Sequence, residues 1–175
     1  MKLQLYSFGE SGHSYKVALA LHFSKAYWEQ IFIDFFQGEA RSEAYKNEIN
    51  IMAEVPVLVY GDKKISQSGA ILDYLNGKTG NYFGKNDEER SEILRWVLWD
   101  NSRLSGSLGP TRFLMNFIPK DKKPVEVINY LQKRNDTALA ILESHLSGKN
   151  WVAADQLSAA DLSCCSYLFY PEEFG

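Results

Sequence analysis

Three short segments carry polar side chains or exposed backbone groups whose types and spacing suit chemistry on a small ligand. The first is Glu10–Ser14, between a strand-like segment and a helix-like one. A serine hydroxyl there could cap the helix, or donate a hydrogen bond to a ligand thiolate, whose formation a helix N-terminus favours. Ser11 is our candidate for that donor because it precedes the helix, whereas Ser14 falls where a capping or first-turn residue is expected. We interpret His13, a single loop histidine, as a solvated surface residue rather than a base.

The second segment is Gln67-Ser68, at the start of a helix-like stretch with apolar residues at Ile71, Leu72 and Leu75. We predict that Ser68 is the N-cap residue of this helix. The free amides of the first turn and the positive end of the helix dipole bind anions. Because Gln67 adds a donor and an acceptor, the pair suits a carboxylate beside an amine, which is the head group of an amino acid.

The third segment is Val55-Pro56, which precedes the buried strand pattern of Val57–Tyr60. Proline cannot donate a ladder hydrogen bond and is confined to strand starts, edges and bulges. Most X-Pro bonds in folded proteins are trans, so the dipeptide alone favours an ordinary strand start. The alternative is a proline-locked turn that leaves the amide and carbonyl of Val55 facing outward, where an extended peptide ligand can pair with them.

The elements that must position these segments alternate between strands and helices over the first half of the chain. The periodicity predicts strands at Leu3–Ser7, Trp28–Phe36, Val57–Tyr60 and Lys64–Ser66, and helices at Ser14–Phe23, Arg41–Ile49 and Ser68–Gly77. A strand–helix–strand unit followed by a hairpin and a helix predicts a small mixed sheet with helices on its faces.

The second half loses the strand signal. Its pattern predicts a linker over Lys78–Glu89 and helices that start at Arg90, near Pro124 and at Ser158. We expect Pro110 to kink or end the first of these helices and Gly148 to end the second. Ser158 and Asp161 fit a capping box, with Asp in place of the usual Glu or Gln, so we interpret Asp161 as a folding signal rather than a catalytic residue.

Composition excludes several classes of protein. The chain has 175 residues, 45% of them hydrophobic, and a net charge of −3. Its lysines and arginines are scattered, so there is no basic patch for nucleic acid. No apolar run approaches the ~18 residues that span a membrane, and the N-terminus has no signal-peptide pattern. The two cysteines, Cys164 and Cys165, are adjacent and offer no disulfide or metal framework. We therefore expect a reduced, cytoplasmic protein without a metal.

Four motifs, in the right order, resemble the cytosolic glutathione transferase family. They are LYSFGESGHSYKVALAL (Leu5–Leu21), EVPVL (Glu54–Leu58), SQSGAILDYL (Ser66–Leu75) and WVAADQLSAADLS (Trp151–Ser163). The resemblance implies an α/β plus all-α fold, with a thioredoxin-like glutathione-binding domain over residues 1–82 and an all-helical domain over residues 87–175. Family members usually continue for a few more helical segments, so we expect the helical domain to be truncated relative to the family.

The resemblance also implies a binding site. In the family the proline matching Pro56 is cis, the peptide group matching Val55 pairs with the cysteinyl part of glutathione, and the pair matching Gln67-Ser68 holds the γ-glutamyl head group. Ser11 aligns with the activating serine of the phi- and zeta-like classes. Gly12 stands where zeta-like enzymes have a second serine, so their isomerase activity is not carried over. The implied glutathione-binding residues are Ser11, Gly12, Val55, Pro56, Gln67 and Ser68.

The function that follows is a glutathione transferase in which Ser11 stabilises the glutathione thiolate for attack on an apolar electrophile. No metal takes part, and glutathione is a co-substrate. Two alternatives stay open: a non-catalytic glutathione-binding or scaffold protein of the same fold, and a glutathione-dependent isomerase or dehalogenase. Classes with a loop cysteine perform mixed-disulfide chemistry. Because this loop has none, and Cys164 and Cys165 lie far along the chain, we expect no disulfide reduction.

The helical half supplies the remaining expectations. Leu104, Leu108 and Arg112 are expected to line the co-substrate pocket between the domains, with the alternative that they are core or surface residues. A two-fold homodimer is expected, since that is the commonest assembly and the one the family forms. Asp100 is expected to reach the glutathione amine of the partner subunit, as an acidic residue on this helix does in some classes.

Overall fold

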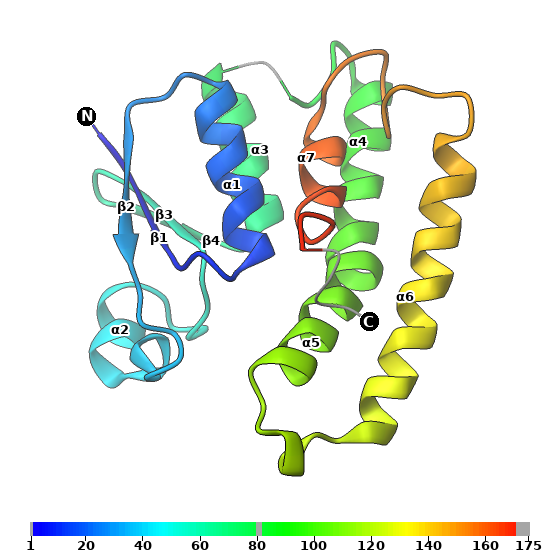
Figure 1. The fold of residues 1–175 in the computed structure, drawn as a ribbon. Coiled ribbons are helices and arrows are strands. Elements are labelled where there is room, and N and C mark those ends of the chain that lie inside the picture. The colour runs from blue at the N-terminus through cyan, green and yellow to red at the C-terminus, as the bar shows by residue number, and fades with distance from the viewer. Residues whose placement is uncertain (1, 80–81, 171–175) are drawn as a thin grey trace. The chain divides into compact units, whose positions relative to one another are not determined.

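The computed structural model describes residues 2–79 and 82–170. The chain divides into two compact units, Met1–Tyr82 and Phe83–Gly175, and each is described here by itself. Figure 1 shows strands and helices in the first unit and helices in the second.

The first unit is built on a four-stranded sheet with the order β2-β1-β3-β4. The strands are β1 (Leu3–Ser7), β2 (Trp28–Phe32), β3 (Val57–Tyr60) and β4 (Lys63–Ser66). β1 pairs with β2 in parallel and with β3 antiparallel, and β3 and β4 form an antiparallel hairpin. The helices are α1 (Gly12–Phe23), α2 (Glu43–Glu48) and α3 (Ser68–Thr79), with a 3₁₀ turn at Glu39–Arg41 before α2.

Strand alternation assigns side chains to the two faces of this sheet. Leu5 pairs with Leu58 in register, and both are completely buried. Figure 1 shows α1 and α3 together on one side of the sheet, where they contact each other. A separate apolar cluster joins Tyr45 of α2 to Val57 of β3. The prediction of a small mixed sheet with helices on its faces is therefore confirmed.

The second predicted strand is too long. β2 ends at Phe32 rather than Phe36, because the chain turns directly after Ile33. The amide of Phe35 donates to the Ile33 carbonyl at 2.8 Å, and the Asp34 carboxylate accepts from the Gln37 amide at 3.1 Å. An aspartate that bonds a nearby backbone amide favours a turn over a strand ladder.

The second unit is helical. Its elements are α4 (Asp87–Trp99), a π-helical turn η2 (Asp100–Leu104), α5 (Ser105–Asn116), a 3₁₀ turn η3 (Lys120–Lys122), α6 (Val125–Leu146) and α7 (Ala159–Cys164). The capping box of Ser158 and Asp161 is confirmed, since the Ser158 amide donates to the Asp161 carboxylate at 2.8 Å. No helix among residues 2–79 and 82–170 is long and apolar enough to cross a lipid bilayer.

Pro110 does not end the helix that contains it. α5 continues from Ser105 to Asn116 with Pro110 inside. An interior proline removes one helical hydrogen bond, which costs about 3 kcal/mol. Packing offsets this cost, because α5 lies against α6 with Leu108 and Thr111 buried. The side-chain amide of buried Asn135 in α6 also donates to the Thr111 hydroxyl oxygen at 3.0 Å.

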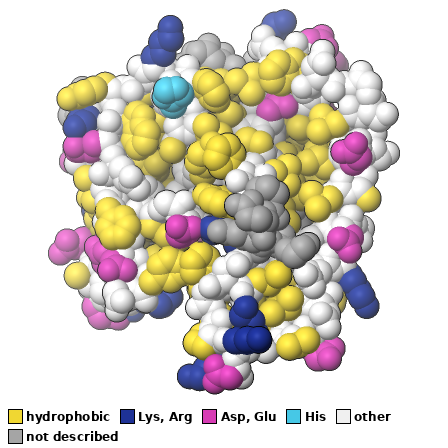
Figure 2. Space-filling view, viewed as in Figure 1, with side chains coloured by type: hydrophobic (Ala, Val, Ile, Leu, Met, Phe, Trp, Pro, Cys, Tyr) yellow, Lys and Arg dark blue, Asp and Glu magenta, His cyan; other side chains and the backbone are white. Residues whose placement is uncertain are grey.

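Large apolar side chains remain exposed on both units (Figure 2). In the first unit, Ile51 is 84% exposed and Met52 is 56% exposed, directly before the Val55-Pro56 segment. In the second unit, Leu94 and Leu98 of α4 are exposed at a spacing of one helical turn. Exposed apolar side chains that cluster in this way are typical of protein–protein contact surfaces.

Candidate functional site

Ser11 is the N-cap of α1. Its Oγ accepts a hydrogen bond from the Ser14 amide at 3.1 Å, and its residue surface is only 6% exposed. The capping role and the proposed chemical role are compatible, because accepting this bond leaves the hydroxyl proton of Ser11 available to a ligand. Gly12 is the first helical residue. The buried hydroxyl of Ser14 has no hydrogen-bond partner among the described residues.

The Val55–Pro56 peptide bond is cis. The resemblance to the family implies this conformation, whereas the dipeptide by itself favours trans. Val55 lies outside the sheet, which begins at Val57, and its side chain packs against the apolar cluster around Tyr45. Within residues 2–79 and 82–170, the backbone of Val55 forms no hydrogen bond. Its amide and carbonyl are therefore available to pair with an extended ligand.

The segment before Val55 is anchored through the carbonyl of Glu54. That oxygen accepts from the Tyr45 hydroxyl at 2.9 Å and from the Asn50 side-chain amide at 3.0 Å. Burial raises the pKa of Tyr45 to about 12, because removal from water disfavours the phenolate. The neutral hydroxyl is the form that donates to Glu54.

We expect Tyr45→Phe to destabilise the fold by about 1 kcal/mol at neutral pH, the usual contribution of one hydrogen bond. The raised pKa of Tyr45 stabilises the folded state below pH 10, and this contribution is lost as pH rises from 10 to about 12. We therefore expect the free energy of unfolding, measured with urea, to fall less between pH 8 and pH 11 in the variant than in the wild type. Tyr27→Phe is the control, since Tyr27 is exposed. If stability falls equally between the two pH values in the wild type and in Tyr45→Phe, the raised pKa of Tyr45 is not the cause of the fall.

The start of α3 differs by one residue from the prediction. The Gln67 carbonyl accepts from the Ile71 amide at 3.0 Å, so Gln67 is the N-cap and Ser68 is the first helical residue. Gln67 has a φ of 69°, in the left-handed region that is unfavourable for residues other than glycine. Such residues cluster at ligand sites. The Gln67 side-chain amide donates to the Glu54 carboxylate at 2.6 Å, and Ser68 is 5% exposed.

Two residues that the sequence analysis did not assign to the site, His13 and Glu54, tie these segments together. Nδ1 of His13, in the first turn of α1, lies 3.3 Å from Oγ of Ser68 at the start of α3. Glu54 bonds Gln67, as described above. His13 is half-buried, so its interpretation as a solvated loop residue is wrong. The sequence could have indicated these two residues only by their positions near Ser11 and Val55. Their contacts were not predictable, because His13 is 55 residues from Ser68 and Glu54 is 13 residues from Gln67.

The four candidate residues of the second unit are buried, which bears on two expectations. Asp100 is 0% exposed, and its carboxylate accepts from the hydroxyls of Ser105 and Ser163. A side chain bonded in the interior of its own unit cannot reach a partner's glutathione, so that expectation is wrong. The others are Leu104, Leu108 and Arg112, with exposures of 0%, 2% and 3%.

These burials favour the alternative that Leu104 and Leu108 are core residues rather than pocket residues. Arg112 stacks its guanidinium on the ring of Tyr170, with 4.0 Å between guanidinium carbon and ring centroid. A cation held over an aromatic ring in this way is a structural contact.

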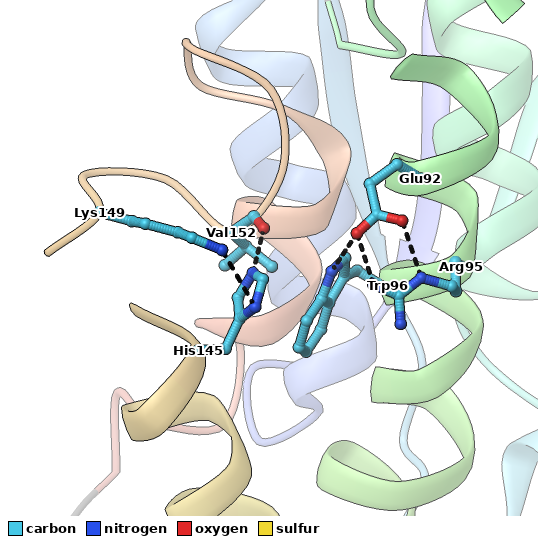
Figure 3. Close-up of polar contacts among 6 residues, drawn as sticks. All are labelled: Glu92, Arg95, Trp96, His145, Lys149 and Val152. Carbon is cyan, nitrogen blue, oxygen red and sulfur yellow. Dashed lines mark hydrogen bonds and ion pairs between the residues drawn. The ribbon is translucent and has the colours of Figure 1, made fainter. Parts of the chain in front are cut away.

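A second polar cluster lies in the helical unit, beside a surface pocket of about 560 Å³ (Figure 3). The Glu92 carboxylate accepts from Arg95 and from the Trp96 indole, and the bonds from Arg95 hold the pKa of Glu92 below its ordinary value. His145 bonds the Val152 carbonyl through Nε2 at 2.7 Å, and its Nδ1 lies 3.4 Å from the Lys149 ammonium. These contacts hold the segment after α6 in place.

Metal ligands and cysteines were the remaining possible centres of chemistry in the described residues. Among the described residues, no group of three His, Cys, Asp or Glu side chains could hold a metal ion. Cys164 is buried in α7 and Cys165 is half-buried at its C-cap, both as free thiols. The polar groups that converge in the first unit are therefore hydroxyls, backbone amides, an imidazole and a carboxylate.

Comparison with known proteins places this geometry in a family. Residues 1–77 match the family described as glutathione S-transferase, N-terminal domain, and residues 111–175 match glutathione S-transferase, C-terminal domain. The chain belongs to the cytosolic glutathione transferase family. It is thus an enzyme of the glutathione transferase type, with the thioredoxin-like and helical domains of that fold.

Individual proteins extend the comparison. A zeta-class enzyme of Euphorbia esula is 29% identical over 92% of this chain and 72% of its own. The disulfide-bond oxidoreductase YfcG of Escherichia coli (strain K12) is 26% identical over 93% and 77%. A Pseudomonas putida glutathione transferase, with one glutathione disulfide bound per subunit, superposes with a TM-score of 0.86 at 22% identity, over 95% of this chain and 74% of that one.

Proposed function

We propose that the first unit, residues 1–82, binds glutathione across the starts of α1 and α3 and activates its thiol as a thiolate. The observation that carries this proposal is the pair of side-chain contacts His13–Ser68 and Glu54–Gln67, which link the three polar segments. Residues 87–175 form the helical domain of the enzyme in this proposal.

Each part of glutathione has a matching group. The γ-glutamyl carboxylate is held by the first-turn amides of α3, with the side chains of Gln67 and Ser68 beside them. The cysteinyl residue pairs through its own amide and carbonyl with the backbone of Val55, in the manner of an added strand. Pro56 follows Val55 directly, and Gly12, the first residue of α1, follows Ser11.

The chemical step is the attack of the glutathione thiolate on an apolar electrophile. The Ser11 hydroxyl donates to the sulfur and lowers the pKa of the thiol, so that more of it is ionised at neutral pH. With an aryl halide, a carbon–sulfur bond forms and halide leaves with the bonding electron pair. The thiol proton passes to water, and no metal takes part.

We also propose a homodimer, supported by the exposed apolar residues Ile51, Met52, Leu94 and Leu98. A cytoplasmic location fits two free thiols. The electrophile site is not assigned to Leu104, Leu108 or Arg112, because these side chains are buried.

The proposal is tested by calorimetric titration with glutathione, followed by turnover assays with a panel of electrophiles that includes a generic aryl halide. We expect glutathione to bind below millimolar concentration and at least one electrophile to be conjugated. Absence of binding at millimolar glutathione would refute the proposed site. Binding without turnover on any electrophile would favour the non-catalytic alternative.

A second candidate function is glutathione-dependent disulfide reduction, and the likeness to YfcG favours it. An activated glutathione thiolate can attack a disulfide sulfur, form a mixed disulfide and release the other thiolate. A second glutathione then resolves the mixed disulfide, so no protein cysteine is required. Adding a small dialkyl disulfide to the panel separates this activity from conjugation.

A further inference from the structure

We propose that His13 is a positioning residue that orients the hydroxyl of Ser68 toward the α-carboxylate of the γ-glutamyl head group. This inference rests on the proposed function, because it concerns the same ligand. His13 acts through Ser68 and does not touch the reacting sulfur in this proposal.

The geometry joins two helix starts. His13 lies in the first turn of α1 and Ser68 in the first turn of α3, and Nδ1 and Oγ are 3.3 Å apart. Ser68 is buried and His13 is half-buried, so the two side chains have little freedom to separate. α1 and α3 pack against each other, which holds both helix starts in register.

The chemistry follows from the single proton of a hydroxyl. If Nδ1 of His13 accepts, the Ser68 proton points at the imidazole and only oxygen lone pairs face a ligand. Lone pairs repel a carboxylate. If Nδ1 carries a proton and donates to Ser68, the hydroxyl proton of Ser68 can point at the carboxylate. A carboxylate bound at the start of α3 therefore selects the second arrangement, and His13 supplies the donor that it requires.

The test compares three single variants by calorimetry with glutathione. His13→Ala removes the donor and is expected to weaken glutathione binding about tenfold, the effect of one hydrogen bond to a charged group. His13→Asn places an amide N–H near the position of Nδ1 and should restore affinity to within about threefold of the wild type. His22→Ala, an exposed histidine on the same helix, should leave affinity unchanged.

Two further measurements separate positioning from a general structural role. His13→Ala should raise KM for glutathione and leave kcat within about twofold, because the sulfur is not involved. In a Ser68→Ala background, His13→Ala should add little further loss, because the residue through which it acts is gone. A glutathione analogue that lacks the head-group α-carboxylate should bind equally to wild type and His13→Ala.

The outcomes distinguish the inference from the function beneath it. If His13→Ala binds glutathione like the wild type, or loses affinity equally for the analogue without the carboxylate, the positioning role is wrong. If circular dichroism shows that His13→Ala is poorly folded, the positioning role is tested with the wild type, His13→Asn and Ser68→Ala instead. Their affinities for glutathione and for the analogue without the α-carboxylate are then compared. If the wild type binds no glutathione at millimolar concentration, the proposed function fails instead.

Discussion

Ser11→Ala is expected to lower kcat with an aryl halide about 100-fold, the usual cost of removing one preorganised donor to a developing or bound anion. The Ser11 Oγ already accepts the Ser14 amide, so its proton is the part of the group that a thiolate can use. Without that proton, the pKa of bound glutathione should rise toward the ~8.5 of a free thiol. Ultraviolet absorbance of the thiolate in the complex measures that pKa directly.

Controls for Ser11→Ala must allow for the capping role of the same side chain. Loss of the N-cap should cost about 1 kcal/mol of stability, which urea unfolding will report separately from turnover. Ser11→Thr keeps a hydroxyl and should retain most activity. Ser14→Ala should be close to wild type. If Ser14→Ala rather than Ser11→Ala loses activity, the donor is Ser14, whose hydroxyl also lacks a described partner.

Asp161→Ala should destabilise the helical unit by about 3 kcal/mol. Oδ1 accepts from the Val152 amide at 2.7 Å, and Oδ2 accepts from the Ser158 amide at 2.8 Å and from its hydroxyl at 2.7 Å. Val152 and Ser158 are buried, so the variant leaves their amides without an acceptor. Hydrogen bonds to charged groups contribute about 1.5–3 kcal/mol each, and an unsatisfied buried amide adds to the loss.

Asp155→Ala is the matched control for this prediction. Asp155 lies in the same connection before α7, is exposed, and forms no hydrogen bond or ion pair with the described residues. Its removal should change the free energy of unfolding by no more than about 0.5 kcal/mol. Asp161→Asn should fall between the two, because an amide retains one acceptor oxygen. Equal stability of the Asp161→Ala and Asp155→Ala variants would show that the capping box contributes nothing.

Much of the fold could be predicted because its signals are local. Apolar alternation predicted β1, and helical spacing predicted α1, α3 and α6 to within a few residues. The spacing of Ser158 and Asp161 predicted the capping box. Two elements differ from the local expectation. Packing against α6 keeps Pro110 inside α5, and a turn at Asp34 ends β2 at Phe32.

The candidate site shows the same division. Residue types alone indicated a hydroxyl before α1, an anion-binding start to α3 and a proline at the mouth of β3. They could not show that His13 meets Ser68 or that Glu54 meets Gln67, because these pairs are distant in sequence. They also could not separate a surface acid from a buried one, which is why Asp100 was misassigned.

The sequence by itself determined where the helices and strands lie and which residue types could bind a thiol and an amino-acid head group, because periodicity and capping act over a few residues. Only the tertiary structure decided the left-handed conformation of Gln67, the burial of Asp100 and the contact between His13 and Ser68. Each of these depends on segments brought together by the packing of α1, α3 and the sheet, or of α4 and α7, and such long-range contacts leave no periodic trace in the chain.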